Sequence, residues 1–216
     1  MRCAVFDLDG TLVDSVEDLT DAANRILAKR GLAPLSVPEV MRMVGDGIRA
    51  LAQRAFAARD AQADEAAIEA LIADYTLHAA DHTRLFPGVT EILAKLTKDS
   101  WRLAVCTNKP EAAAHSLLSA LGVDHLFAAI GGGDSFPVRK PDPANLRATL
   151  ERAGGSADRA VMVGDNRNDV AAATGLGMPC IFAAWGYGTP DMAKGAARIA
   201  KSITEVPVMA ADLLRV

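Results

Sequence analysis

Short apolar runs recur along the 216-residue chain and alternate with longer segments of helical periodicity. We predict strands at residues 3–6, 102–106, 128–130, 160–163 and 180–183, because each is a continuous apolar run. Such runs are typical of parallel strands that are covered on both faces. The segments between them carry helical signals, and several of these segments end at a glycine. The alternation therefore predicts an α/β fold with a parallel sheet.

One stretch, residues 15–82, breaks this alternation because it shows helical periodicity and no strand. Its first helix is expected to begin with a capping box formed by Ser15 and Asp18. We therefore predict an all-helical subdomain at 15–82, inserted into a core formed by residues 1–14 and 83–216. Its alanine-rich helices are expected to pack on one another, with a dimer face as the alternative, so we expect a monomer or a homodimer.

Composition and charge exclude several classes of protein. Half of the residues are hydrophobic, which excludes a disordered chain. No apolar run approaches the roughly 20 residues of a membrane span, and Asp7 interrupts the N-terminal run too early for a signal peptide. The net charge is −4 without a basic run, so neither nucleic acid nor a membrane is expected as a partner. We expect a cytoplasmic protein whose three isolated cysteines are buried rather than bonded or metal-bound.

Acidic residues gather directly after two of the predicted strands. Asp7 and Asp9 follow the first strand, and Gly10 permits a sharp turn behind them. Asp165 follows the fourth strand, with Asp169 one helical turn further on. Ligands of open α/β sheets bind beyond the carboxyl ends of the strands, where these residues would meet. Clustered carboxylates cost energy unless a cation or a proton relieves them, and oxygen ligands without His or Cys favour Mg²⁺ over zinc or copper.

A phosphate-binding pocket is expected beside these acids. Thr107 and Asn108 follow the second strand and can bind phosphate oxygens at the head of a helix, although simple helix capping is the alternative. Lys140 precedes Pro141 and is a candidate for a fixed cation, with a solvated lysine as the alternative. Together these segments predict an acidic metal site next to a phosphate pocket.

These residues resemble a known family. The segments Asp7-x-Asp9-Gly10-Thr11, Thr107, Lys140-Pro141 and Gly164-Asp165-x-x-x-Asp169 are similar, in order, to the four motifs of the haloacid dehalogenase-like hydrolases. Within that family, Met43-Val44-Gly45-Asp46-Gly47-Ile48 and Trp185-Gly186-Tyr187-Gly188 resemble the phosphoglycolate phosphatase branch. The resemblance implies a Rossmann-like core, a helical cap at 15–82, Mg²⁺ dependence and hydrolysis of a small phosphate ester.

The resemblance also implies a role for each matching residue. Asp7 would be the nucleophile that forms an aspartyl-phosphate, and Asp9 would be the general acid and base. Mg²⁺ would be held by the side chains of Asp7 and Asp165 and by the backbone carbonyl of Asp9. The residues expected to bind the phosphate are Thr107, Asn108 and Lys140.

The expected substrate is 2-phosphoglycolate, whose carboxylate could be met by Arg49 or Arg54 in the cap. A sugar phosphatase, a pyrophosphatase and a β-phosphoglucomutase remain alternatives, because the core motifs do not distinguish them. A dehalogenase is disfavoured by Asp9. A signalling receiver or a non-enzymatic phosphate-binding module is disfavoured by the helical insert and by the complete motif set.

Overall fold

A six-stranded sheet forms the centre of the protein, whose computed structural model describes residues 1–214. The strands are β1 (Cys3–Phe6), β4 (Arg102–Cys106), β5 (Ala129–Gly131), β6 (Ala160–Gly164), β7 (Cys180–Ala183) and β8 (Arg198–Ala200). Their order is β5-β4-β1-β6-β7-β8, and every neighbouring pair is parallel. The five predicted strands are confirmed to within one residue at each end, and β8 is an edge strand that was not predicted.

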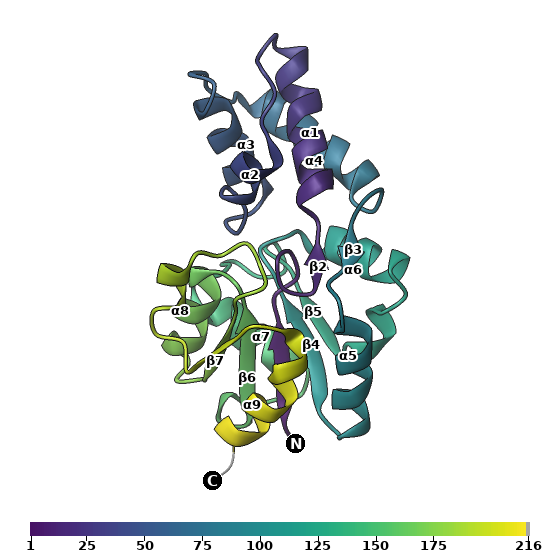
Figure 1. Ribbon diagram of the computed structural model, residues 1–216, viewed down its shortest axis with the longest axis vertical. Coiled ribbons are helices and arrows are strands. Elements are labelled where there is room, and N and C mark those ends of the chain that lie inside the picture. The colour runs from purple at the N-terminus through teal and green to yellow at the C-terminus, as the bar shows by residue number, and fades with distance from the viewer. Residues whose placement is uncertain (215–216) are drawn as a thin grey trace.

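Helices cover both faces of this sheet, as Figure 1 shows. The helices are α5 (Val89–Lys98), α6 (Glu111–Ala120) and α9 (Val206–Leu213) on one face, and α7 (Pro143–Arg152) and α8 (Arg167–Gly175) on the other. Successive side chains of a strand point to opposite faces, so Ala4 and Phe6 of β1 pack on the first set and Cys3 and Val5 on the second. Four 3₁₀ turns lie in the loops, at Asp124–Leu126, Ala157–Arg159, Pro190–Ala193 and Ile203–Glu205.

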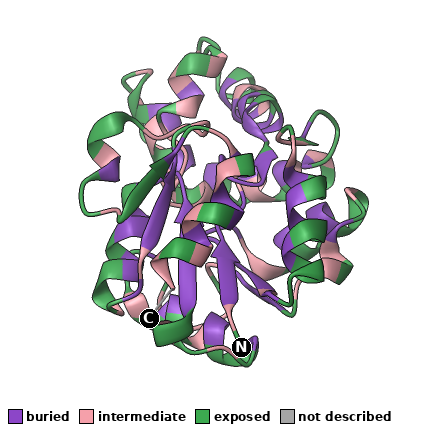
Figure 2. Ribbon diagram, turned by 60° about the horizontal axis from the view of Figure 1, so that its bottom comes forward, coloured by how far each residue is buried: buried purple, intermediate pink, exposed green. Residues whose placement is uncertain are grey.

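Burial explains why the central strands are largely apolar. All four residues of β1, for example, are buried, and the strands form the buried centre of the view in Figure 2. Cys3, Cys106 and Cys180 are free and buried, which confirms the prediction for the cysteines. The α/β fold with a parallel sheet is therefore confirmed. No helix among residues 1–214 combines the length and the apolar character that a membrane span requires.

Four further helices lie beyond the carboxyl ends of the strands (Figure 1). These helices, which we call the cap helices, are α1 (Val16–Lys29), α2 (Val37–Met41), α3 (Ile48–Ala57) and α4 (Glu65–His78). Their apolar side chains form a cluster of their own, which includes Leu27, Phe56 and Leu71. A short antiparallel pair, β2 (Val13–Asp14) with β3 (Arg84–Leu85), forms where the chain leaves the core and returns. The division of the chain at 15–82 stays a prediction.

The junction between core and cap helices differs from the sequence prediction. Ser15 does precede α1, but its side chain makes no capping bond and instead donates to Asp9 Oδ1 at 2.6 Å. Asp18 accepts from the backbone amide of Thr83 at 2.9 Å and from its hydroxyl at 2.7 Å. The predicted capping box is therefore wrong, because both side chains bond to partners across the junction. Tyr187 also binds here, since its hydroxyl accepts from the Ser15 amide at 2.7 Å.

Candidate active site

Three carboxylates meet at the carboxyl ends of two neighbouring strands. Asp7 directly follows β1, and Asp165 and Asp169 follow β6. One oxygen from each of the three lies within 4.8 Å of the others, and all three residues are buried. The fold therefore brings Asp7 and Asp165 together, although 157 residues separate them in the sequence.

The loop after β1 fits closely around Asp165. Gly10 has φ +85°, and a Cβ built at this position would lie 2.4 Å from Asp165 Oδ2. Only glycine fits this position without displacing the carboxylate. Thr11 Oγ1 donates to Asp165 Oδ1 at 2.9 Å, and the amide of Tyr187 donates to Oδ2 at the same distance. These contacts fix the orientation of Asp165.

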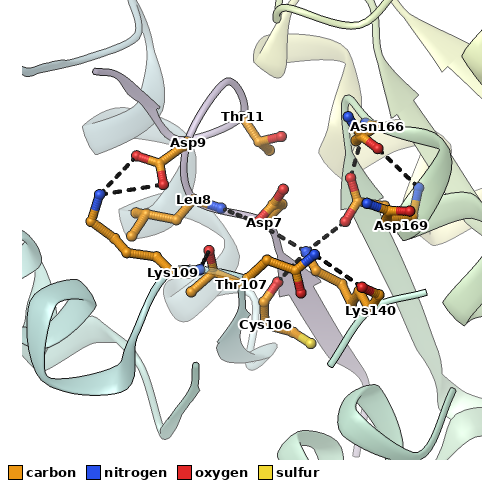
Figure 3. Close-up of polar contacts among 12 residues, drawn as sticks. Asp7, Leu8, Asp9, Thr11, Cys106, Thr107, Lys109, Lys140, Asn166 and Asp169 are labelled. Carbon is orange, nitrogen blue, oxygen red and sulfur yellow. Dashed lines mark hydrogen bonds and ion pairs between the residues drawn. The ribbon is translucent and has the colours of Figure 1, made fainter. Parts of the chain in front are cut away.

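Lys140 supplies the positive charge of this cluster. Its Nζ lies 2.9 Å from Asp7 Oδ1 and 2.6 Å from Asp169 Oδ1, and it donates to the carbonyl of Cys106 at 2.6 Å (Figure 3). The residue is only 2% exposed, so the alternative of a solvated surface lysine is excluded. One ammonium among three carboxylates leaves an excess of negative charge in a buried site.

Burial, together with this excess of negative charge, raises the pKa of two of the acids. Burial, and then the charge of Asp169, raises the pKa of Asp7 above its ordinary value, while Lys140 opposes the shift. Burial, and then Asp169, raises the pKa of Asp165 to about 7, although hydrogen bonds from Tyr187 and Thr11 lower it. A cation bound between these carboxylates would oppose both shifts, because it favours their ionised forms.

Asp9 lies apart from the three clustered acids and is held by two donors. Ser15 donates to Oδ1, and Lys109 Nζ lies 3.2 and 3.3 Å from the two carboxylate oxygens (Figure 3). The same ammonium donates to the hydroxyl of Tyr75, which comes from α4 of the cap helices. Burial lowers the pKa of Lys109, but Asp9 and Tyr75 together raise it above its ordinary value, so the side chain is charged.

Thr107 and Asn108 both lie in the pocket wall after β4, but their side chains differ in the hydrogen bonds that they already make within the protein. The hydroxyl of Thr107 accepts from the Lys109 amide at 3.2 Å and can still donate its proton. The side-chain amide of Asn108 donates to the carbonyls of Gly45 at 2.9 Å and of Lys140 at 3.0 Å. That nitrogen is therefore engaged with the protein itself. Asn108 joins the core to the loop between α2 and α3, residues 42–47, which we call the cap loop.

The cap loop around Gly45 docks on the core through amide side chains. Asn168 donates to the Gly45 carbonyl at 3.2 Å and to Asp46 Oδ1 at 2.7 Å. Gly45 has φ +123°, and a Cβ there would lie 2.2 Å from Asn166 Nδ2, so the loop approaches too closely for a side chain. Arg54 braces the loop from α3, because it bonds Asp46 and the carbonyl of Met43. The cap loop is therefore closed on the core in this structure.

A pocket lies between the core and the cap helices. Its core side is polar and includes Asp7, Asp9, Thr107, Asn108 and Lys109. Its cap side is largely apolar and includes Leu19, Val44, Ile48, Leu51 and Ile72, together with Tyr75 and Thr76. A ligand in this pocket would therefore present its charged end to the carboxyl ends of the strands.

Comparison with known proteins identifies the family. A model for haloacid dehalogenase-like hydrolases matches residues 4–183. The chain belongs to this family. It is 43% identical over 188 residues to a phosphoglycolate phosphatase of Agrobacterium fabrum. The matched region covers 85% of this chain and 81% of that relative. The identity to a phosphoglycolate phosphatase of Rhodospirillum rubrum is 44% over 200 residues, covering 89% and 83%.

A solved structure of the same haloacid dehalogenase-like fold covers nearly the whole chain. A predicted phosphoglycolate phosphatase from Haemophilus somnus superposes with a TM-score of 0.88 at 30% identity, over 97% of both chains. The helical insert is thus shared with that structure along with the sheet. With relatives of this kind over most of its length, the protein is a phosphatase of the haloacid dehalogenase-like family.

The acids of this haloacid dehalogenase-like site fit a divalent cation. All the candidate ligand atoms are carboxylate oxygens, which Mg²⁺ prefers, and they are close enough to share one ion. The excess negative charge and the raised pKa of Asp165 show that the site favours an added positive charge. The side chain of Asp169 belongs to this cluster as well, where it also accepts from Lys140 and from the Asn166 amide.

Two predicted cap residues lie outside the pocket, and two unpredicted residues lie within it. Arg49 donates to both carboxylate oxygens of Glu65, and Arg54 bonds the cap loop, so neither lines the pocket. The prediction that one of them faces a substrate carboxylate is not supported by this arrangement. Lys109 and Tyr75 do line it. The sequence carried no local signal for their pairing, because 34 positions separate them.

Proposed function

We propose that this phosphatase hydrolyses 2-phosphoglycolate with Mg²⁺ through an aspartyl-phosphate on Asp7. The observation that carries the proposal is the buried carboxylate of Asp7 at the bottom of a pocket, with Lys140 2.9 Å away and two further carboxylates beside it. The named activity of relatives at 43% and 44% identity supports this choice of substrate. The small, largely apolar cap side of the pocket favours a compact substrate over a sugar phosphate, whose hydroxyls need several polar partners.

Asp7 is the proposed nucleophile, because a carboxylate can attack phosphorus and divide one slow hydrolysis into two faster steps. Lys140 holds Asp7 in place and offsets the repulsion between the carboxylate and the incoming phosphate. When bound, Mg²⁺ adds further charge neutralisation for the transferred phosphoryl group. The residues proposed to hold it are Asp7 and Asp165 through their side chains and Asp9 through its backbone carbonyl, with Asp169 adjacent.

Asp9 is the proposed general acid and base. In the first step its carboxyl proton passes to the leaving alkoxide of glycolate, and in the second the carboxylate takes a proton from the water that cleaves the aspartyl-phosphate. The position of this side chain is set by Ser15 and Lys109. Since the Asp9 side chain lies outside the cluster of three acids, we do not propose it as a cation ligand, and it is available for proton transfer.

The phosphate oxygens are proposed to bind Thr107, Lys140 and Asn108. The Thr107 hydroxyl retains a proton to donate, and Lys140 is already positioned at Asp7. The side-chain nitrogen of Asn108 is engaged with Gly45 and Lys140, so its proposed contact uses the backbone amide. Closure of the cap loop excludes water while these contacts form. A cytoplasmic location and a monomeric or homodimeric state remain predictions.

Phosphate release from a panel of monoesters tests the function. With Mg²⁺ present, kcat/KM for 2-phosphoglycolate is expected to exceed that for sugar phosphates, and chelation should abolish turnover. Asp7→Asn should lower kcat by about 10⁴-fold or more while the circular dichroism spectrum is retained. Asp60→Asn, at an exposed loop, is the matched control and should keep full activity. Equal rates for sugar phosphates, or an active Asp7→Asn variant, would contradict the proposal.

A further inference from the structure

Lys109 occupies a position in the pocket that the catalytic steps above do not fully explain. Its side chain is 3% exposed, and Nζ lies 3.2 Å from Asp9 Oδ1, next to the proposed proton donor. Orientation of Asp9 alone would require only a neutral donor, and Ser15 already supplies one at 2.6 Å. A buried ammonium is a costly group to place here unless its charge has a use.

Among residues 1–214, Lys109 is the one basic side chain in the wall of this pocket. Lys140 is bonded to Asp7, to Asp169 and to a backbone carbonyl, so it serves the phosphate end. Arg49 and Arg54 are paired with Glu65 and Asp46, which do not line the pocket. An additional negative charge on a substrate can therefore be met in this pocket by Lys109.

Distance limits where that negative charge lies on the substrate. Asp9 must touch the ester oxygen in order to protonate it, and Lys109 Nζ touches Asp9. In an ester of a 2-hydroxy acid, a carboxylate oxygen lies about 3 Å from the ester oxygen, because only two carbons intervene. The ammonium can thus contact such a carboxylate while Asp9 contacts the ester oxygen. A longer substrate would carry its second charge beyond Lys109, against the apolar side chains of the cap.

Tyr75 connects this position to the cap helices. Its hydroxyl accepts from Lys109 Nζ, and the ammonium lies 4.3 Å from the centre of the ring. Tyr75 is itself buried, at 4% exposure, in α4. The orientation of the ammonium is therefore completed by a cap residue when the cap helices lie on the core.

We propose that Lys109, oriented by Tyr75, binds a carboxylate that the substrate carries one carbon away from its phosphate ester oxygen. Lys109 is then the residue that selects phosphorylated 2-hydroxy acids over esters of similar size without a carboxylate. This inference rests on the proposed function, because it assigns the recognition of the glycolate half of 2-phosphoglycolate. The competing role is that Lys109 only positions Asp9.

The two roles are separated by a pair of substrates that differ in the carboxylate. Ethyl phosphate replaces the carboxylate of 2-phosphoglycolate by a methyl group and keeps the same ester linkage. Selectivity is the ratio of kcat/KM for 2-phosphoglycolate to kcat/KM for ethyl phosphate. A residue that only positions Asp9 affects both substrates equally, so its loss leaves this ratio unchanged.

Lys109→Met is expected to lower the selectivity about 50-fold, mainly through a higher KM for 2-phosphoglycolate, because a charge-assisted hydrogen bond is lost. Tyr75→Phe keeps the ring and should lower the same ratio several-fold. Lys109→Arg should retain part of the selectivity, since the charge remains. The matched control is Lys95→Met, an exposed lysine on α5 that pairs with Asp99 and should leave the ratio unchanged.

The outcomes distinguish this inference from the proposed function. If the wild-type protein prefers 2-phosphoglycolate and Lys109→Met keeps that preference, recognition by Lys109 is refuted and the proposed function stands. If the wild-type protein prefers 2-phosphoglycolate to sugar phosphates but not to ethyl phosphate, recognition of the carboxylate is refuted and the proposed function stands; if it also shows no preference over sugar phosphates, both are refuted. Should Lys109→Met fail to fold, Tyr75→Phe decides the matter, because unchanged selectivity in that folded variant overturns the inference.

Discussion

Replacement of Asp165 by asparagine is expected to make the metal-free protein more stable while it removes activity. Asp165 is 3% exposed, and its carboxylate lies among like charges. The substitution keeps the shape of the side chain and removes one of these charges. The wild-type protein retains this unfavourable charge because the proposed Mg²⁺ site requires it.

The size of the effect follows from the pKa of Asp165, which burial and Asp169 raise from 3.8 to about 7. Such a shift corresponds to about 4 kcal/mol of electrostatic penalty when the carboxylate is ionised. Asparagine loses one of the hydrogen bonds from Thr11 and Tyr187, which costs about 1–2 kcal/mol. The net gain in the free energy of unfolding is therefore about 2–3 kcal/mol at pH 8.

The gain has a defined dependence on pH. A raised pKa means that the folded state binds the proton more tightly than the unfolded state, so the wild-type protein loses stability as pH rises from about 4 to about 7. Below this interval the acid is protonated in both states, and the variant should show only the lost hydrogen bond. Above it, the advantage of the variant is complete.

Urea unfolding in the presence of a chelator, at several pH values, measures the difference in the free energy of unfolding between the variant and the wild type. Asp165→Asn should unfold at higher urea than the wild type at pH 8, and the difference should shrink towards pH 4. Excess Mg²⁺ should stabilise the wild type much more than the variant. The exposed control Asp60→Asn should follow the wild type throughout. A variant no more stable than the wild type at pH 8 without metal would refute the electrostatic reasoning.

Three further substitutions test other parts of the site. Asp9→Asn is expected to slow both formation and cleavage of the aspartyl-phosphate about 10²–10⁴-fold in rapid-quench experiments, and unchanged rates would exclude its role in proton transfer. Lys140→Met leaves Asp7 without its buried cation and should cost about 3–5 kcal/mol in urea unfolding with chelator, whereas an unchanged midpoint would contradict the ion pairing. Asn168→Ala removes the bond to Asp46 and should raise KM several-fold and speed hydrogen exchange in the cap loop; unaltered exchange would show that this bond does not hold the loop.

Local patterns predicted the parts of the fold whose burial is complete. The runs at β1, β6 and β7, and β4 after its first residue Arg102, are apolar because the sheet is covered on both faces there. The edge strand β8 lacks this signature, since Arg198 is exposed and Ile199 is 56% exposed. The pair β2–β3 joins residues about 70 positions apart, so no local signal marked its two short strands.

The same distinction applies to the candidate site. Asp7, Asp165 and Lys140 follow strand ends or lie in a proline-bounded loop, and these positions indicated where they would meet. Lys109 had no such signal, because its partner Asp9 is 100 positions away and a lysine near a helix start is usually solvated. The prediction for Ser15 and Asp18 was wrong because residues that can cap a helix can equally bond across a junction. The positions of Lys109 and of the Ser15 and Asp18 side chains are set by contacts between segments that are distant in the sequence.

Tyr187 bonds both to Asp165, a proposed ligand of Mg²⁺, and to the junction between the core and the cap helices. Its backbone amide donates to Asp165, while its hydroxyl accepts from the first amide groups leading into α1 and donates to Asp14. A tilt of the first cap helix that moves those amide groups must either break their bonds or pull on the loop that steadies Asp165. If the cap helices open for product release, Asp165, a proposed ligand of Mg²⁺, would thus be loosened at the same time, and the affinity for the ion would fall as the product leaves.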